Sequence, residues 1–255
     1  MIQRTFARIA QLEPAPPWGM LSAIATVIAM FAAMVIGTTV AVTVLVGQEA
    51  ANSVALTLDL RPDVLPIGWI IGAILTIAFV WSGRRRQVDR DALRLNVSAL
   101  PLPFLLLLGL GFAILLDLIS LAVTGQFLPT PELHYLAFGE STVSAWGAAV
   151  LLMVLAQPIA EELVFRGILF PALRAATGAW AGLFLSALLY GTSHLLTYAP
   201  PQEGLVGVWY GLFAPLLAGL VIGGIRAYTG STRAAIVMHV GFGIFAILKA
   251  LTITG

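Results

Sequence analysis

The chain has 255 residues, of which 60% are hydrophobic and only 10% are charged, and its mean hydropathy is +0.99. A soluble globular domain carries about 25% charged residues, so this chain cannot cover a water-facing surface. Its net charge of +1 is too small to indicate nucleic acid as a partner. The lack of cysteine excludes disulfides, thiolate metal sites and a cysteine nucleophile. The class that remains is a helical, multi-pass membrane protein.

Runs without a charged residue mark the expected membrane spans. Most of them reach the roughly 20 residues that a helix needs to cross about 30 Å of hydrocarbon. Helix is expected because a bilayer interior leaves no water for free backbone groups, and the alternating pattern of a barrel is not seen. The sequence predicts an all-α bundle of seven spans, with room for an eighth short one: Pro14–Gln48, Val64–Gly83, Leu95–Leu116, Ser141–Ala160, Ala175–Gln202, Gly204–Ile225 and Ala234–Leu248.

Lysine and arginine are divided unevenly between the two ends of these spans. With a cytoplasmic N-terminus, eleven of the 13 fall on the cytoplasmic side and only Arg61 and Lys249 fall outside. Such an excess is typical of cytoplasmic loops, so we predict a cytoplasmic N-terminus. The first apolar run is too long for a signal peptide and is expected to be a retained helix. We expect an integral protein of the plasma (inner) membrane, with the lipid bilayer as one of its partners.

Two adjacent carboxylates interrupt the apolar sequence of the fourth run, in the segment QPIAEELVFRG. Ionisable groups at membrane depth cost roughly 2.5–3.5 kcal/mol each on insertion scales, so they are paired or face a water-filled cavity. Glu162 and Arg166 are four residues apart with the acid first, which favours an ion pair. Glu161 is turned about 100° away and lacks that partner. Pro158 cannot donate a helical hydrogen bond, which predicts a kink one turn before the glutamates.

A turn is predicted at Thr177-Gly178. Glu161 lies 16 residues before Thr177 and His194 lies 16 residues after Gly178, so antiparallel helices would bring both side chains to the same depth. His239 also lies in an apolar run. A carboxylate beside histidines in a cavity suits the activation of water. The same oxygen and nitrogen donors would suit zinc, with one position left for water.

Three motifs stand at these positions: Glu-Glu-x-x-x-Arg at Glu161, Glu162 and Arg166, aromatic-x-x-x-His at Tyr190 and His194, and the first residue of His-x-x-x-Asn at His239. In this order they resemble the CPBP family (CAAX protease and bacteriocin-processing) of intramembrane proteases, which includes the Rce1-type prenyl endopeptidases. The sequence departs from the family's pattern at Gly243, where the family has asparagine. The likeness covers roughly residues 141–252.

The resemblance implies a CPBP-type intramembrane endopeptidase that hydrolyses a peptide bond near the cytoplasmic membrane interface. Residues 1–255 would form one integral-membrane domain, with three spans in 1–140 and a protease-like core in 141–252. The substrate would be a peptide or membrane protein, of prenylated or bacteriocin-like type. The family is described both as metalloproteases and as enzymes with a metal-free glutamate mechanism. The roles implied are water activation by Glu161 and His194, support from Glu162 and Arg166, and an oxyanion-donor or metal-ligand role for His239, with Glu161, His194 and His239 as the zinc ligands.

Two alternatives stay open. Glycine at position 243 supplies no side-chain amide, and the loss of one oxyanion donor costs on the order of 100-fold or more in rate, which would make this chain a weakened relative. The other alternative is a transporter or scaffold that uses the buried ionisable cluster, since acidic chains mark proton paths and Asp117 is also intramembrane. Hydrolysis requires Glu161, His194 and His239 to meet at one cavity, whereas a transport path would connect Asp117 to it.

Other intramembrane protease classes fit the sequence less well. His-Glu-x-x-His and Gly-x-Gly-Asp are both absent from the sequence. Ser193 and His194 are neighbours on a helix and point about 100° apart, so they do not form a dyad with each other. A catalytic pair of Ser193 with His239 is the serine-protease site that stays possible.

Overall fold

The chain is all helical in the computed structural model, which describes residues 2–47, 61–96, 98–139, 142–198 and 202–254. No strand occurs within these ranges. Seven helical units there are long and apolar enough to span a membrane, as predicted: α2 (Met20–Leu45), α4 (Val64–Gly83), α6 (Leu102–Thr124), α8 to α10 (Val143–Thr177), α11 (Ala179–Thr197), α12 to α13 (Gly204–Thr229) and α14 (Thr232–Thr254). The shorter elements are α1 (Ile2–Ala10), α5 (Gln87–Ala92), the 3-10 turn η2 (Pro131–Leu133) and α7 (His134–Phe138).

Several predicted span limits are wrong because helices continue through charged residues. The corrected limits of the third span are Leu102–Thr124 in place of Leu95–Leu116, and the fourth span ends at Thr177 in place of Ala160. The predicted start at Ser141 lies outside the described residues. Asp117 lies inside the third span and forms an ion pair with Lys249 of α14. The acidic pair of the fourth span lies in mid-helix. Paired charges need not end a span, because each one neutralises the other inside the bundle. The predicted limit at Gln48 lies outside the described residues.

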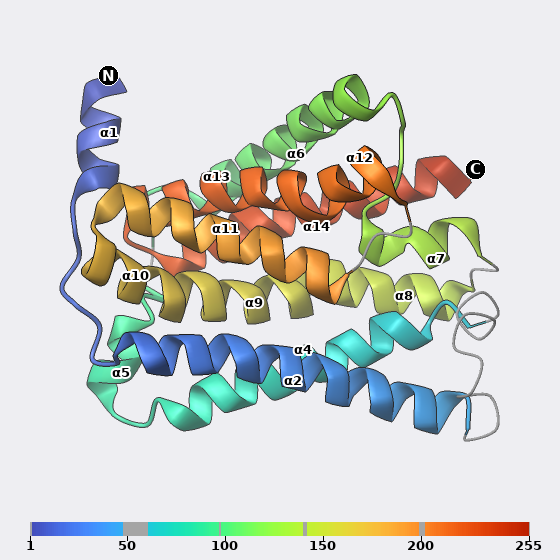
Figure 1. Cartoon of the computed structure of the whole chain (residues 1–255), viewed down its shortest axis with the longest axis horizontal. Coiled ribbons are helices and arrows are strands. Elements are labelled where there is room, and N and C mark those ends of the chain that lie inside the picture. Colours follow the sequence, from blue (N-terminus) through green and yellow to red (C-terminus); the bar gives the residue numbers. More distant parts are fainter. Residues whose placement is uncertain (1, 48–60, 97, 140–141, 199–201, 255) are drawn as a thin grey trace.

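The long helix Val143–Thr177 lies in the middle of the bundle (Figure 1). On one side it contacts α2 and α4, which pack against each other, and on the other side it contacts α11 and α14. α13 packs against α11, and α6 packs against α14. The turn predicted at Thr177-Gly178 is confirmed, with Gly178 at φ +91° between α10 and α11. That backbone conformation is open to glycine at little cost, so the two helices fold back directly.

Three wide π-helical turns interrupt the spanning helices, and each lies just before a proline. The long helix divides into α8 (Val143–Leu151), the π turn η3 (Leu152–Ala156), α9 (Gln157–Glu162), the π turn η4 (Leu163–Leu169) and α10 (Phe170–Thr177), and the next span divides into α12 (Gly204–Val208), the π turn η5 (Trp209–Phe213) and α13 (Ala214–Thr229). The prolines are Pro158, Pro171 and Pro215. Proline removes one helical hydrogen bond and crowds the preceding turn, which a π turn relieves. The kink expected at Pro158 stays a prediction; the structure shows that a π turn ends at Ala156, about one helical turn before the acidic pair.

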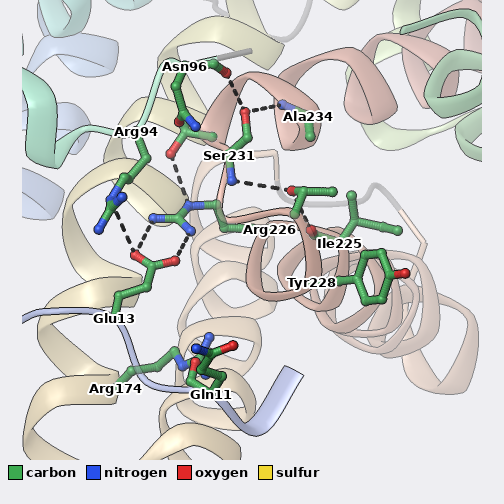
Figure 2. Close-up of polar contacts among 12 residues, drawn as sticks. Gln11, Glu13, Arg94, Asn96, Arg174, Ile225, Arg226, Tyr228, Ser231 and Ala234 are labelled. Atoms are coloured by element: carbon green, nitrogen blue, oxygen red, sulfur yellow. Dashed lines mark hydrogen bonds and ion pairs between the residues drawn. The ribbon is translucent and has the colours of Figure 1, made fainter. Parts of the chain in front are cut away.

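The two ends of the bundle differ in charge. The end that holds the N-terminus, α5 and the turn between α10 and α11 is here called the arginine end; the C-terminus, α7 and the start of α8 lie at the opposite end (Figure 1). At the arginine end, the N-terminal segment is tied to the turn between α13 and α14 (Figure 2). Arg226 is fully buried and its guanidinium donates to both carboxylate oxygens of Glu13. Arg174 donates to the carbonyls of Ile9 and Gln11.

Candidate active site

The predicted ion pair between Glu162 and Arg166 is present at the centre of the bundle. Arg166 Nη1 lies 3.0 Å from Glu162 Oε1, and both side chains are fully buried. The same carboxylate oxygen lies 2.9 Å from His239 Nδ1 on α14. Arg166 also donates to the carbonyl of Gly219 at 3.1 Å, and its guanidinium lies over the ring of Tyr190 at 4.2 Å. Glu162 therefore holds one histidine in place while Arg166 balances its charge.

Glu161 points to a different set of partners, as its position on the helix predicted. Its Oε1 accepts hydrogen bonds from Gln157 Nε2 at 3.0 Å and from the hydroxyl of Tyr198 at 2.9 Å. Its Oε2 is buried, has no hydrogen-bond partner among the described residues, and lies 3.9 Å from His194 Nε2. The hairpin prediction that Glu161 and His194 lie at the same depth is confirmed. A gap of 3.9 Å is too long for a direct hydrogen bond and is the kind that a shared water molecule bridges.

A second carboxylate, Glu132, reaches His194 from a part of the chain that the sequence did not single out. It lies in η2, and its Oε1 is 3.6 Å from His194 Nε2 and 3.3 Å from Gln157 Nε2. The side chain is buried, although η2 belongs to a connection between spans. The sequence carries one signal for it, a glutamate directly after a proline at position 131 in a connection that carries no other charged residue between 126 and 139. His194 thus faces two carboxylates, Glu161 and Glu132.

One cavity joins these groups. Its walls include both intramembrane histidines together with Glu132, Gln157 and Tyr190. Glu161 lies directly behind this wall and meets it through Gln157 and His194. His194 and His239 therefore meet at this cavity, whereas Glu161 does not line it and approaches it only through its partners, 3.9 Å from His194.

The Asp117–Lys249 ion pair lines the same cavity, farther from the histidines along α6 and α14. Asp117 is thus connected to the cavity, as a transport path would require, although its charge is already neutralised by Lys249. The structure does not support the pairing of Ser193 with His239, because the Ser193 hydroxyl donates to the carbonyl of Tyr190 at 2.7 Å within its own helix.

The comparisons with known proteins give one family. Residues 143–245 match the family model described as type II CAAX prenyl endopeptidase Rce1-like. This segment is therefore similar to an Rce1-like domain. The resemblance drawn from the three motifs is confirmed for this segment, and the seven apolar helices indicate an integral, multi-pass membrane protein. No curated protein and no solved structure matches the chain significantly.

The Rce1-like domain begins after Glu132, so the family match does not include this carboxylate. It does include the long helix, α11 and α14 up to position 245, and hence both glutamates of the acidic pair and both histidines of the cavity. The site therefore combines side chains of the Rce1-like domain with one carboxylate that an N-terminal connection supplies.

The described side chains of the Rce1-like domain do not form a ready metal site. Among them, no three His, Asp or Glu side chains are arranged to hold a metal ion. His239 uses Nδ1 for Glu162, and His194 approaches Glu161 and Glu132 at 3.9 and 3.6 Å. Zinc needs nitrogen and oxygen donors about 2.0–2.2 Å from one point. Zinc coordination by Glu161, His194 and His239 stays a prediction.

Gly243 stands where the family's motif has asparagine, and packing explains why. A Cβ at this position would lie far inside contact distance of the carbonyl oxygen of Met153 in η3. The backbones of α14 and the long helix therefore touch here, and the space for a larger side chain is taken up by Met153. Adding atoms to a fully packed interior forces the backbone to shift and lowers the stability of the fold.

Restoring the family's asparagine is consequently expected to harm this protein. We expect Gly243→Asn to destabilise it by about 1–3 kcal/mol or more, because α14 must move away from Met153. Thermal unfolding in detergent measures the loss. Gly224→Asn is the matched control, since a Cβ at Gly224 of α13 meets no atom within 4 Å. A Gly243→Asn protein as stable as the Gly224→Asn protein, or one with higher activity than wild type, would contradict this reading of the contact.

Proposed function

We propose that the chain is an intramembrane endopeptidase in which Glu161 and His194 activate a water molecule for attack on a peptide bond. The observation that supports this most strongly is the pair of facing atoms, Glu161 Oε2 and His194 Nε2, which lie 3.9 Å apart beside a cavity that His194 lines. The segment that carries both residues matches an Rce1-like domain. Both atoms are close enough to bind one water, and a buried carboxylate oxygen that lacks a partner needs such a donor.

In this mechanism the carboxylate of Glu161 takes a proton from water as the oxygen attacks the carbonyl carbon. Gln157 and Tyr198 donate to the other carboxylate oxygen and so fix its direction. The C–N bond then breaks, and the proton passes to the leaving amine. His194 lies at hydrogen-bond reach of the same water and is placed to relay that proton.

His239 is proposed to stabilise the oxyanion that forms during attack. Its Nδ1 is engaged by Glu162, so Nε2 is the ring nitrogen left for the cavity. When protonated, the ring donates from Nε2, and the carboxylate of Glu162 supports the positive charge. This donor is part of the reason why a missing asparagine at position 243 need not abolish the reaction.

We further propose that Glu132 is a positioning residue for His194. Glu132→Gln keeps the size of the side chain but removes its charge beside Nε2. We expect kcat to fall by about 10- to 100-fold, the usual effect of losing a group that orients a reacting side chain, while KM changes little. Glu132→Asp should restore part of the rate. A loss that is confined to KM, or a loss that follows the amount of folded protein, would contradict this role.

The proposal is tested by incubating the purified protein in lipid vesicles with peptides of stated type: prenylated C-terminal peptides, bacteriocin-like leader peptides and unmodified membrane-spanning segments. Mass spectrometry then looks for one new pair of termini. Cleavage of any class supports the endopeptidase and names its substrate. Proton flux across the vesicle membrane without cleavage would instead favour the transporter alternative, whose specific support is the place of Asp117 in the cavity wall.

A further inference from the structure

If the chain is the peptidase proposed above, its substrate must reach the cavity from one particular side of the membrane. The two ends of the bundle are clearly distinguished by charge. The arginine end carries these residues: Arg4, Arg8, Arg84, Arg85, Arg86, Arg90, Arg94, Arg174, Arg226 and Arg233. The opposite end carries Arg61 and Lys249. Because lysine and arginine accumulate on the cytoplasmic side of membrane proteins, the arginine end is the cytoplasmic one.

The cavity extends from the histidines toward the other end on each element of its wall. On α14 the lining residues follow His239 and continue to Lys249, near the C-terminus of the helix. On the long helix the lining residues Met153 and Gln157 precede the acidic pair, on the side of α8. α6 contributes only residues 113–120, from its second half, which runs away from the arginine end. The connection after α6 adds residues 128 and 130–132.

The path toward the arginine end is closed. Directly beyond Glu162 the long helix presents Val164, Phe165 and Ile168, all fully buried, and these pack with Leu93 in one apolar cluster. Arg166 fills the remaining space, fully buried between Glu162, Gly219 and Tyr190. A peptide has no route through this packed region.

We propose that the chamber takes its peptide from the non-cytoplasmic side, so that the substrates are segments of membrane or exported proteins lying in or on the non-cytoplasmic half of the bilayer. A cytoplasmic N-terminus and cleavage near the cytoplasmic interface, both expected from the sequence, cannot both be true of this cavity. The first follows from the arginines of the chain itself. The second came with the family resemblance, and the direction of the cavity argues against it.

The experiment uses the lack of cysteine, which makes single-cysteine labelling free of background. Three variants of the full chain are compared in right-side-out and inverted membrane vesicles with a charged, membrane-impermeant methanethiosulfonate. Ala214→Cys probes the cavity wall on α13. Val143→Cys probes the exposed surface at the opposite end, and Val88→Cys probes the exposed surface of α5 at the arginine end. A thiol that faces only lipid stays unreacted, because the reagent is charged.

We expect Val143→Cys and Ala214→Cys to react in right-side-out vesicles and Val88→Cys to react only in inverted ones. Reaction of Val143→Cys only in inverted vesicles would reverse the orientation and overturn the proposal. Reaction of Ala214→Cys from the same side as Val88→Cys, or from neither side, would overturn it as well. None of these readouts needs catalysis. A chain that cleaves no peptide can therefore still pass this test, and an active peptidase can fail it.

Discussion

Replacing Glu161 by glutamine is expected to lower the rate of peptide cleavage by about 100- to 10,000-fold, the range that a general base contributes. Glutamine has nearly the same size and can still accept the hydrogen bond of Tyr198, which is 2.9 Å long in the wild type. It cannot take a proton from water. The change therefore removes the proposed chemistry while it leaves most of the packing intact. Initial rates at saturating peptide, normalised to folded protein, measure it.

His194→Ala provides the second arm of this prediction. If Glu161 and His194 act on one water molecule, the double variant should be no slower than the worse single variant, because groups that work as a unit are not additive. Losses that multiply in the double variant would indicate independent roles. Thermal unfolding of each protein separates a catalytic loss from a structural one, since both side chains are buried.

The second large effect is expected at the arginine end, far from the cavity. Glu13→Gln leaves the fully buried guanidinium of Arg226 without its carboxylate, and breaking a buried ion pair in this way costs about 3–5 kcal/mol. The N-terminal segment should then detach from the turn between α13 and α14 (Figure 2). Unfolding in detergent measures the loss. Glu203→Gln is the matched control, because Glu203 is exposed and should change stability by about 0.5 kcal/mol or less.

The same ion pair predicts a dependence of stability on pH. Burial raises the pKa of Glu13, but the hydrogen bond and charge of Arg226, with the charges of Arg94 and Arg174, outweigh it, so its pKa lies below the usual value. A carboxyl whose pKa is lower when folded stabilises the protein above its unfolded pKa, and the gain is lost as the pH falls through the folded pKa. Glu13→Gln should lack this part of the acid destabilisation. Equal acid sensitivity in both proteins would count against the ion pair.

Much of the architecture follows from the sequence because membrane burial leaves a strong pattern. Charge-free runs gave seven spans, and helical spacing gave the Glu162–Arg166 pair and the separate direction of Glu161. Counting residues on each side of the turn at Gly178 predicted that His194 lies beside Glu161. All of these depend on distances along one or two helices, where geometry follows directly from residue number.

The features that the sequence did not give depend on contacts between distant segments. Glu132 reaches His194 only because η2 turns into the bundle, and no periodic pattern marks that approach. Tyr198 lies against Trp69 of α4, with ring centroids 4.9 Å apart, and so is held toward Glu161. The limit of the third span at Leu116 was wrong for the same reason, since the charge of Asp117 is tolerated through Lys249 on another helix. The packing of Gly243 on Met153 likewise needs the position of both helices.

The most direct test of the catalytic site compares Glu161→Gln with Ser193→Ala in one cleavage assay. Ser193 is adjacent to His194, but its hydroxyl is bound to the carbonyl of Tyr190. We predict that the wild type and Ser193→Ala cleave the same peptide bond at similar rates and that Glu161→Gln cleaves it at least about 100-fold more slowly. Cleavage by Glu161→Gln at the wild-type rate, together with its loss in Ser193→Ala, would show that a serine attacks the bond and that the glutamate-activated water does not exist.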